Sequence, residues 1–363
     1  MAFQVPQYSR RQVRLAGDVL RDDEAGFDAI ARAMPIINNW RSSHAYPLNT
    51  FQATLRKRLR GLGMEGAPVG QRLKRLPSIA AKLRRFPSMS LERMQDIAGL
   101  RAVVPGMRRL ESLYSSYLGG ARFLHELRNV HNYVENPKAD GYRSIHLIYR
   151  YVNPRAPQYD GLHVELQLRT KMQHAWATAV ETVDTFAKQA IKAGRPDPQW
   201  AEFFKLASAA FAISEKAPLP AGFHGESVES IHERLCEAEA ALNVLVRLRG
   251  FSVAANHIHS TTRSSAAYHL VVLNTDDRMV NIRSFAGDRL DDAAEAYAAA
   301  EERAAKGEPL DAVLVAGGNV DQLRKAYPNY FLDASLFLSR LQRICVGHRD
   351  TTQARVLKAG ARR

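Results

Sequence analysis

The chain has 363 residues, 46% of them hydrophobic and 24% charged, which provides enough apolar surface for folded cores and argues against disorder throughout. That length exceeds one ordinary core and favours a larger domain with one or two smaller units. Lys and Arg number 51 against 37 Asp and Glu, so the formal net charge of +14 suits a polyanionic partner such as nucleic acid or a nucleotide, although a merely soluble basic surface has the same composition.

The cysteines and the hydropathy pattern exclude several other classes. Cys236 and Cys345 each fall in an expected helix and neither has a second Cys nearby, so we expect neither zinc nor a disulfide framework. No segment approaches a membrane-spanning length, and no apolar stretch follows the basic residues near the start. We therefore expect a cytoplasmic protein with no membrane partner.

The first two thirds of the chain alternate between helical and strand patterns. Apolar residues at three- and four-residue spacing predict helices over 11–20, 24–34 and 50–62, the last strongly basic, and another over 70–85. A buried strand is expected within 94–104 and a helix over 110–118. Strands over 144–151 and 163–169, separated by a turn at 153–161, then precede helices from Lys171 to about Leu248.

The pattern changes at Gly250. Strand-like runs over 251–257, 267–273 and 279–285, with a turn at 274–277, predict a small antiparallel unit. An Ala-rich helix over 291–305 and a strand over 312–316 follow, and helices around 320–325 and 331–346 precede a basic tail. The expected division is 1–249, a β-rich unit over 250–317 and a helical region over 318–363.

Cationic side chains recur within the helix expected over 70–85. Lys74, Ser78, Lys82 and Arg85 fall at offsets of zero, four, eight and eleven residues, which would place them on one helical face. Such a face could hold a triphosphate by charge-assisted hydrogen bonds. Taken alone, the segment fits a solvated helix surface better.

The segment 163–169 carries the densest polar pattern. Strict alternation places His163, Glu165, Gln167 and Arg169 on one side of a strand and aliphatic residues on the other. Asp96, at the start of the other strand, offers a second carboxylate. Two carboxylates can hold Mg²⁺ while substrate phosphates complete its octahedron, which fits phosphoryl or pyrophosphoryl transfer.

A loop over 136–146 separates these segments. Its Pro and Gly define the turn, and Tyr142 is expected to emerge beside Lys138 and Arg143 as an aromatic platform among cations. Such a ring could stack under a purine or under the terminal base of a nucleic acid. A structural tyrosine at the start of a strand is the plainer alternative.

Together these segments resemble the synthetase domain of the RelA/SpoT family, over about 56–184. That family's motifs run R-x-K-x-x-x-S-x-x-x-K, D-I-x-G-x-R, P-K-x-x-G-Y-x-S-x-H and V-E-x-Q-x-R-T, and all four occur here in order. The matching residues are Arg72, Lys74, Ser78 and Lys82; Asp96, Gly99 and Arg101; Pro137, Lys138, Gly141, Tyr142, Ser144 and His146; and Val164, Glu165, Gln167, Arg169 and Thr170. The resemblance implies an α+β fold, in which a mixed-sheet nucleotidyltransferase-like domain is flanked by helices and followed by the small antiparallel unit and C-terminal helices.

The resemblance also implies the chemistry, which is transfer of pyrophosphate from ATP to a ribose hydroxyl. Asp96 and Glu165 would hold Mg²⁺, Glu165 would help deprotonate the attacking hydroxyl, and Tyr142 would stack the acceptor. The residues implied in ATP binding are Arg72, Lys74, Ser78, Lys82 and Arg101, and those implied in acceptor binding are Lys138, Tyr142, His146, Gln167 and Arg169.

The family offers two acceptors, guanine nucleotides (GDP or GTP) and the 3′ CCA end of tRNA. Two departures from the housekeeping pattern, Asp140 where Asn is frequent and the segment after Thr170, put guanine-nucleotide use in doubt. A basic surface would suit a tRNA acceptor stem, although a surface without a partner competes with that interpretation. The basic residues concerned are Arg56, Lys57, Arg58, Arg60, Arg84 and Arg85.

The last third adds a more specific resemblance. Tyr330, Asp333 and Phe337 match the Y-x-x-D-x-x-x-F element of CapRel-type fused toxin-antitoxins, and their spacing would put them on one helical face. That resemblance implies an autoinhibitory C-terminal region, a preceding unit like a pseudo-zinc-finger, and a phage protein such as a capsid protein as the activator. An amphipathic helix in an ordinary core would show similar spacing.

Three functions therefore remain open from the sequence. The first is an autoinhibited tRNA pyrophosphotransferase in phage defence. The second is a small alarmone synthetase whose C-terminal region senses something else. The third is a catalytically silent, basic RNA-binding protein, against which the retained Asp96, Glu165, Tyr142 and phosphate-binding cations argue.

Overall fold

The structure is a computed structural model, and it describes residues 3–118, 123–190, 198–261, 266–274, 276–277, 279–316 and 335–347. The chain divides into two units, Met1–Val134 with Ser144–Thr170, and Glu135–Arg143 with Lys171–Arg363. The second unit thus includes a short loop from the middle of the first unit's sequence. The threefold division expected from the sequence stays a prediction.

The first unit begins with the expected helices, α1 (Arg10–Arg21), α2 (Phe27–Ser43) and α3 (Ala45–Gly61). Ser9 starts α1 with a capping box, because the Ser9 side chain accepts from the Gln12 amide while the Gln12 side chain accepts from the Ser9 amide. The apolar stripe of α3 is buried at Phe51, Leu55 and Leu59. The predicted helical start of the chain is confirmed.

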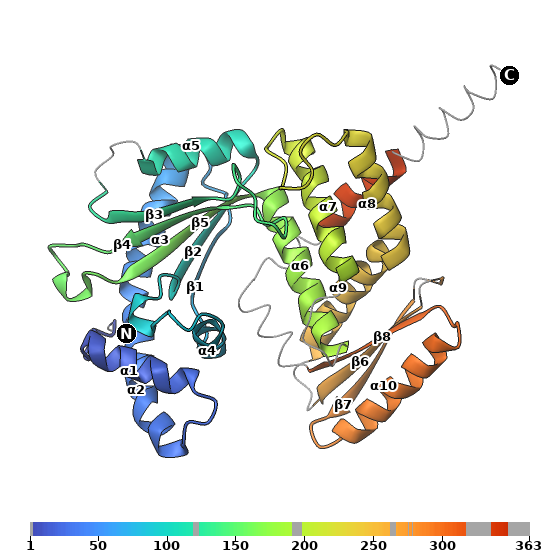
Figure 1. The fold of residues 1–363 in the computed structure, drawn as a ribbon, viewed down its shortest axis with the longest axis horizontal. Helices are drawn as coiled ribbons and strands as arrows, with labels where there is room; N and C mark the ends of the chain where they lie inside the picture. Colours follow the sequence, from blue (N-terminus) through green and yellow to red (C-terminus); the bar gives the residue numbers. More distant parts are fainter. Residues whose placement is uncertain are drawn as a thin grey trace. The chain divides into compact units, whose positions relative to one another are not determined.

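In the described part of the first unit, a mixed sheet follows, with strand order β1-β2-β5-β4-β3 (Figure 1). The β2–β5 pair is parallel and the other pairs are antiparallel. Helix α3 and α5 (Met107–Leu118) pack against strands of this sheet. The strands are β1 (Val69–Leu73), β2 (Ala98–Val104), β3 (Glu126–Asn132), β4 (Ile145–Arg150) and β5 (His163–Thr170), and the short helical turns η1 (Leu91–Arg93) and η2 (Pro157–Tyr159) lie between them.

Two expectations for this unit were wrong or incomplete. The helix expected over 70–85 is strand β1 followed by α4 (Leu76–Arg85), because residues 69–73 pair with β2 and the helix begins only near Pro77. Strand β3 was not expected. It lies at the sheet edge, where six of its seven residues are exposed, so its sequence lacks the alternation that reveals a half-buried strand.

The second unit combines helices with a small antiparallel sheet, ordered β7-β6-β8 among the described residues. The expected helix over 291–305 and the strands over 267–273, 279–285 and 312–316 are confirmed, and residues 335–347 are helical. The elements are α6 (Lys171–Ala190), α7 (Pro198–Glu215), α8 (Val228–Leu242), α9 (Val244–Thr261), β6 (Ala266–Asn274), β7 (Met279–Ala286), α10 (Leu290–Ala305) and β8 (Leu310–Ala316).

The strand expected over 251–257 was wrong, because these residues continue helix α9. Gly250, which suggested a break, lies inside that helix. A Cβ there would come within 2.1 Å of Leu273 Cδ2 on β6, so the glycine permits a close contact between helix and strand. Tyr330, Asp333 and the helix expected around 320–325 lie outside the described residues. None of the described helices is long and apolar enough to cross a bilayer.

Candidate active site

Polar side chains gather on one face of the first unit's sheet. Gly99 of β2 is paired with Arg72 of β1 and with Glu165 of β5, and Gln167 of β5 is paired with Arg101 and His146. Directly paired residues project to the same face of a sheet. The side chains that share this face are those of Arg72, Arg101, His146, Glu165 and Gln167. The intervening Val164, Leu166 and Leu168 are fully buried, which confirms the alternation predicted for this strand.

Asp96 is held by two ammonium groups just before β2. Its Oδ2 lies 3.0 Å from Lys74 Nζ and 2.8 Å from Lys82 Nζ. Lys74 follows β1 and Lys82 lies on α4, so the turn between the two elements brings both cations to one carboxylate. The lysines expected to share a helical face thus converge by a different route, and Arg72 and Ser78 of the same motif are exposed.

The backbone of Lys74 is fixed on both sides. Its amide donates to the Ile97 carbonyl at 2.7 Å, and its carbonyl accepts from Arg41 Nε at 2.7 Å. Arg41 lies on α2, far from the motif in sequence, and sequence reasoning missed it. A lone arginine at the end of an amphipathic helix gives no signal of such a role.

Charge keeps Asp96 ionised despite its burial. Burial raises the pKa of the Asp96 carboxyl. The charges and hydrogen bonds of Lys74 and Lys82 together lower it by more, so the pKa lies below its ordinary value. The carboxylate is therefore the form present at neutral pH.

Glu165 is held by polar partners on its own sheet. Its Oε1 lies 2.9 Å from His146 Nδ1, and its Oε2 accepts from Gln167 Nε2 at 2.8 Å. Arg169 Nη2 in turn donates to Gln167 Oε1 at 3.2 Å. Burial raises the pKa of Glu165, the bond and charge of His146 lower it, the nearby charge of Asp96 raises it, and Gln167 lowers it, with a net shift downward. In this arrangement His146 and Gln167 contact the carboxylate, and their predicted role in binding the acceptor stays a prediction.

The two carboxylates suit a hard divalent cation. Asp96 Oδ1 is buried and has no hydrogen-bond partner among the described residues, which leaves a charged oxygen available to a ligand. Glu165 is close enough that the Asp96 charge shifts its pKa. Within the described ranges no group of three or more His, Cys, Asp or Glu could hold a metal, so Mg²⁺ bound here would complete its shell with substrate oxygens and water.

The loop predicted to bind the acceptor belongs to the second unit and has its own turn. Asp140 Oδ1 accepts from the Tyr142 amide at 2.9 Å, and the Gly141 amide donates to the Lys138 carbonyl at 2.9 Å. Asp140 thus makes the Asx turn that an Asn would make. Lys138 Nζ lies 5.1 Å from the centre of the Tyr142 ring, which confirms the expected cation beside the aromatic platform.

Arg143 is not one of the cations around the Tyr142 ring, contrary to expectation. Its side chain is 2% exposed and forms an ion pair with Glu215 of α7, at 2.9 Å. Burial lowers the pKa of Arg143, and the charge and hydrogen bond of Glu215 raise it. An unpaired guanidinium would be costly in such a site, so the partner on α7 explains the inward orientation.

The residues predicted to bind tRNA fall into two groups. Arg56, Lys57 and Arg60 are exposed on α3. Arg58 is partly buried, donates to the Ser116 carbonyl and stacks 4.4 Å from the Tyr117 ring centre.

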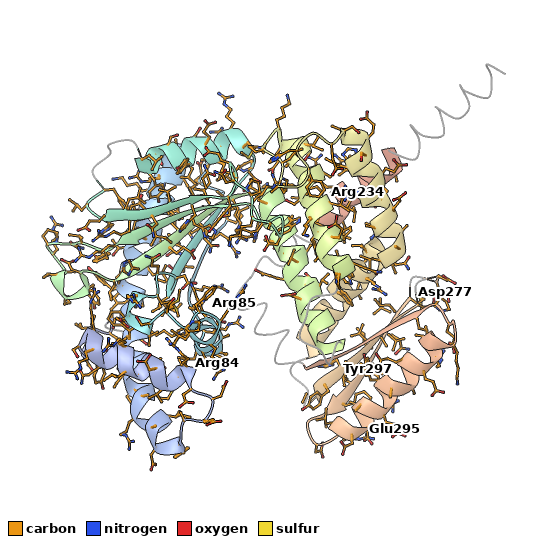
Figure 2. The ribbon with its side chains drawn as sticks, in the orientation of Figure 1. Arg84, Arg85, Arg234, Asp277, Glu295 and Tyr297 are labelled. Atoms are coloured by element: carbon orange, nitrogen blue, oxygen red, sulfur yellow. The ribbon has the colours of Figure 1, made fainter. Side chains whose placement is uncertain are left out.

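Arg84 and Arg85 lie at the end of α4 (Figure 2). Arg84 pairs with Asp23 at 2.6 Å, and the Arg85 guanidinium lies 5.4 Å from the Phe86 ring centre. Arg58 and Arg84 therefore have structural contacts that a sequence pattern does not reveal.

Phe337, predicted to be autoinhibitory, is fully buried in the second unit. Its ring centre lies 6.3, 6.1 and 5.3 Å from those of Phe203, Phe204 and Phe211 of α7. The helical residues 335–347 are therefore anchored to α7 by an aromatic cluster.

Comparison with known proteins agrees with these motifs. Residues 71–187 match the family described as a region found in RelA / SpoT proteins. An uncharacterized protein of Mycobacterium tuberculosis is 29% identical over 184 residues, which is 48% of this chain and 59% of that protein. A GTP pyrophosphokinase of Bacillus subtilis is 32% identical over 109 residues, which is 30% of this chain and 51% of that protein. The chain thus spans less than two thirds of the length of either relative.

Solved structures of small alarmone synthetases are also similar. Synthetase 1 of Bacillus subtilis bound to its product pppGpp has a TM-score of 0.42 and 24% identity, over 48% of this chain and 89% of that chain. Synthetase 2 of the same organism has a TM-score of 0.42 and 21% identity, over 49% and 94%. The family match falls on the segments that carry Lys74, Lys82, Asp96 and Glu165, so residues 71–187 are similar to a region found in RelA / SpoT proteins.

Proposed function

We propose that this protein is an ATP pyrophosphokinase that transfers the β,γ-pyrophosphate of ATP to a ribose hydroxyl. The observation that carries the proposal is the pair of carboxylates Asp96 and Glu165. One is bound by Lys74 and Lys82 through a single oxygen, while its other oxygen is buried without a partner among the described residues. Cations and carboxylates in this arrangement suit a polyphosphate bound with a divalent metal.

The chemistry follows from the charges. The ribose oxygen attacks the β-phosphorus, the bond from that phosphorus to the α,β-bridging oxygen breaks, and AMP leaves with that oxygen. Glu165, ionised at neutral pH, accepts the proton of the attacking hydroxyl. Lys74 and Lys82, with Arg72 and Arg101 of the same face, stabilise the charge on the phosphates. Mg²⁺ bound to Asp96 and Glu165 would supply further neutralisation of that charge.

We favour the 3′ CCA end of tRNA as the acceptor. The net charge of +14 and the exposed Arg56, Lys57 and Arg60 of α3 support a polyanionic partner larger than a nucleotide. Tyr142, with Lys138 beside its ring, would stack the terminal base. Modification of that end would prevent aminoacylation and stop translation.

The alternative acceptor is a guanine nucleotide, which would make the protein a small alarmone synthetase. Two observations favour it. A relative that matches over 109 residues is a GTP pyrophosphokinase. Asp140 also keeps the Asx turn of the loop, so its difference from Asn does not disturb the backbone that presents Tyr142.

We further propose that the C-terminal region restrains the enzyme as a fused antitoxin, released by a phage protein such as a capsid protein. The support is the spacing of Tyr330, Asp333 and Phe337 in the sequence, which matches the element of the fused toxin-antitoxins. A trigger of this kind would bind the open state and shift the population toward it.

One experiment tests all three proposals. Purified protein is mixed with γ-labelled ATP and either GDP, GTP or deacylated tRNA, with Glu165→Gln and Tyr330→Ala alongside wild type. Label on tRNA that increases in Tyr330→Ala and is lost in Glu165→Gln would support a restrained tRNA-modifying toxin. Label on guanine nucleotides alone would support the alarmone synthetase, and no label on any acceptor would refute pyrophosphate transfer to these acceptors.

A further inference from the structure

We propose that Ser208 of α7 is a positioning residue of the acceptor site, which fixes Tyr142 by binding the backbone next to it. The inference rests on the proposed function in one respect, namely that Tyr142 stacks the acceptor. Ser208 lies outside the residues 71–187 that match the family. The acceptor site would therefore depend on a helix beyond the recognisable synthetase region.

The hydroxyl of Ser208 is directed at the loop. Its side chain is 1% exposed, and Oγ donates to the Gly141 carbonyl at 2.6 Å. That carbonyl belongs to the peptide whose nitrogen is the Tyr142 amide, and this amide donates to Asp140 Oδ1 at 2.9 Å. Both polar atoms of the peptide before Tyr142 are thus held, which fixes the plane from which the Tyr142 side chain departs.

The loop lies directly against α7 at this point. Gly141 has φ of +89°, and a Cβ there would come within 2.9 Å of Ser208 Cβ and 3.3 Å of Lys205 Cα. Only glycine allows both this backbone conformation and this approach. The glycine of the G-Y motif is therefore explained by the helix it touches, and a larger residue would push the loop away from Ser208.

A second contact of the same helix holds the other side of Tyr142. Glu215 pairs with Arg143 at 2.9 Å, and the two side chains are only 10% and 2% exposed. Glu215 follows Ser208 by seven residues, so the two lie on one face of α7, two turns apart. The residues before and after Tyr142 are thus bound to a single rigid element.

The Tyr142 ring is also positioned relative to α7. It forms a T-shaped pair with Trp176, with ring centres 6.4 Å apart, and Trp176 Nε1 donates to the Phe204 carbonyl of α7 at 2.8 Å. Lys138 lies over the ring. Of these contacts, the Ser208 hydroxyl can be removed with the least change in volume, so Ser208 provides the cleanest test.

The test compares Ser208→Ala with Ser214→Ala in the full chain. Ser214 lies on the same helix, but its hydroxyl donates to the Phe211 carbonyl of its own helix, at 2.8 Å. Two quantities are measured: the amide hydrogen exchange of residues 136–143, and the KM values for ATP, GDP and deacylated tRNA in the labelled-transfer assay.

We expect the amides of residues 136–143 to exchange hydrogen about tenfold faster in Ser208→Ala than in wild type. The KM for the acceptor should rise about tenfold, which is the size expected for one lost buried hydrogen bond. The KM for ATP should stay within about twofold of wild type, and Ser214→Ala should match wild type in both measurements. Loop exchange equal to that of Ser214→Ala would overturn the inference, as would a parallel rise in the KM values for ATP and acceptor. If neither wild type nor Tyr330→Ala transfers label to an acceptor, the proposed function fails, whereas the exchange measurement still decides whether Ser208 fixes the loop.

Discussion

Asp96, bound by two lysines, links the stability of the first unit to pH. Its pKa is lower in the folded chain than the ordinary 3.8, so the stabilisation is complete above that value and is lost as pH falls through the folded pKa. Asp96→Asn cannot titrate. We expect this variant to be less stable at neutral pH and to lose less further stability below about pH 4 than wild type.

Urea unfolding at a series of pH values measures this effect. Asp23→Asn is the matched control, because its carboxylate pairs with Arg84 but its side chain is 75% exposed. Its stability curve should follow that of wild type. If the free energy of unfolding of Asp96→Asn changed with pH as steeply as that of wild type, the lysines would not hold the carboxylate in its charged form.

Glu165 allows a sharper test of catalysis at the same scale. Glu165→Gln keeps the size of the side chain but removes its charge and its ability to accept a proton. We expect the kcat for pyrophosphate transfer to fall by about 10²- to 10⁴-fold, with the far-UV circular dichroism unchanged. Glu126→Gln, on edge strand β3 and paired with Arg150, should keep wild-type kcat. A Glu165→Gln enzyme that retains its kcat would exclude the residue as the general base.

At the scale of elements, the ion pair between Arg143 and Glu215 joins the acceptor loop to α7. Arg143→Leu removes the guanidinium that faces the Glu215 carboxylate, whose side chain is only 10% exposed, and we expect the unfolding free energy to fall by about 3–5 kcal/mol. The double change Arg143→Leu and Glu215→Leu should recover most of that loss. Denaturant unfolding of the full chain measures both.

The control for this pair is Arg234→Leu. Arg234 pairs with Glu226 at 2.8 Å and with Glu202 at 3.0 Å, but its side chain is 41% exposed. It should cost less than about 1 kcal/mol. If Arg143→Leu costs no more than Arg234→Leu, the buried pair does not anchor the loop.

The elements also show what the sequence can predict and why. Strand β5 was predictable, because burial on one face of a sheet imposes alternation of polar and aliphatic residues on 163–169. Strand β1 was mistaken for helix, because Lys74 and Lys82 have helical spacing although a turn lies between them. Ser208 could not have been found, since its hydrogen bond to Gly141 joins residues 67 positions apart and leaves no local pattern.

At the scale of the whole molecule, the excess of positive charge should appear as salt dependence. If Arg56, Lys57 and Arg60 of α3 contact tRNA phosphates, changing all three to Ala should reduce the slope of log K against log salt by about 2–3. Binding of deacylated tRNA at several salt concentrations measures this slope. Changing the exposed Arg303 and Lys306 near the end of α10 is the control and should leave it unaltered. Equal slopes in both variants would place the nucleic acid elsewhere.

The second unit takes residues 135–143 from the middle of the sequence, and this has a consequence for deletion mapping. A fragment limited to residues 1–187 would keep α3, Asp96 and Glu165 but lose Ser208 and Glu215. In this fragment Arg143 of the acceptor loop would lack the Glu215 carboxylate with which it pairs. We expect such a fragment to be inactive. A mapping study would then assign catalysis to the downstream region, although that region supplies the helix surface against which the loop folds.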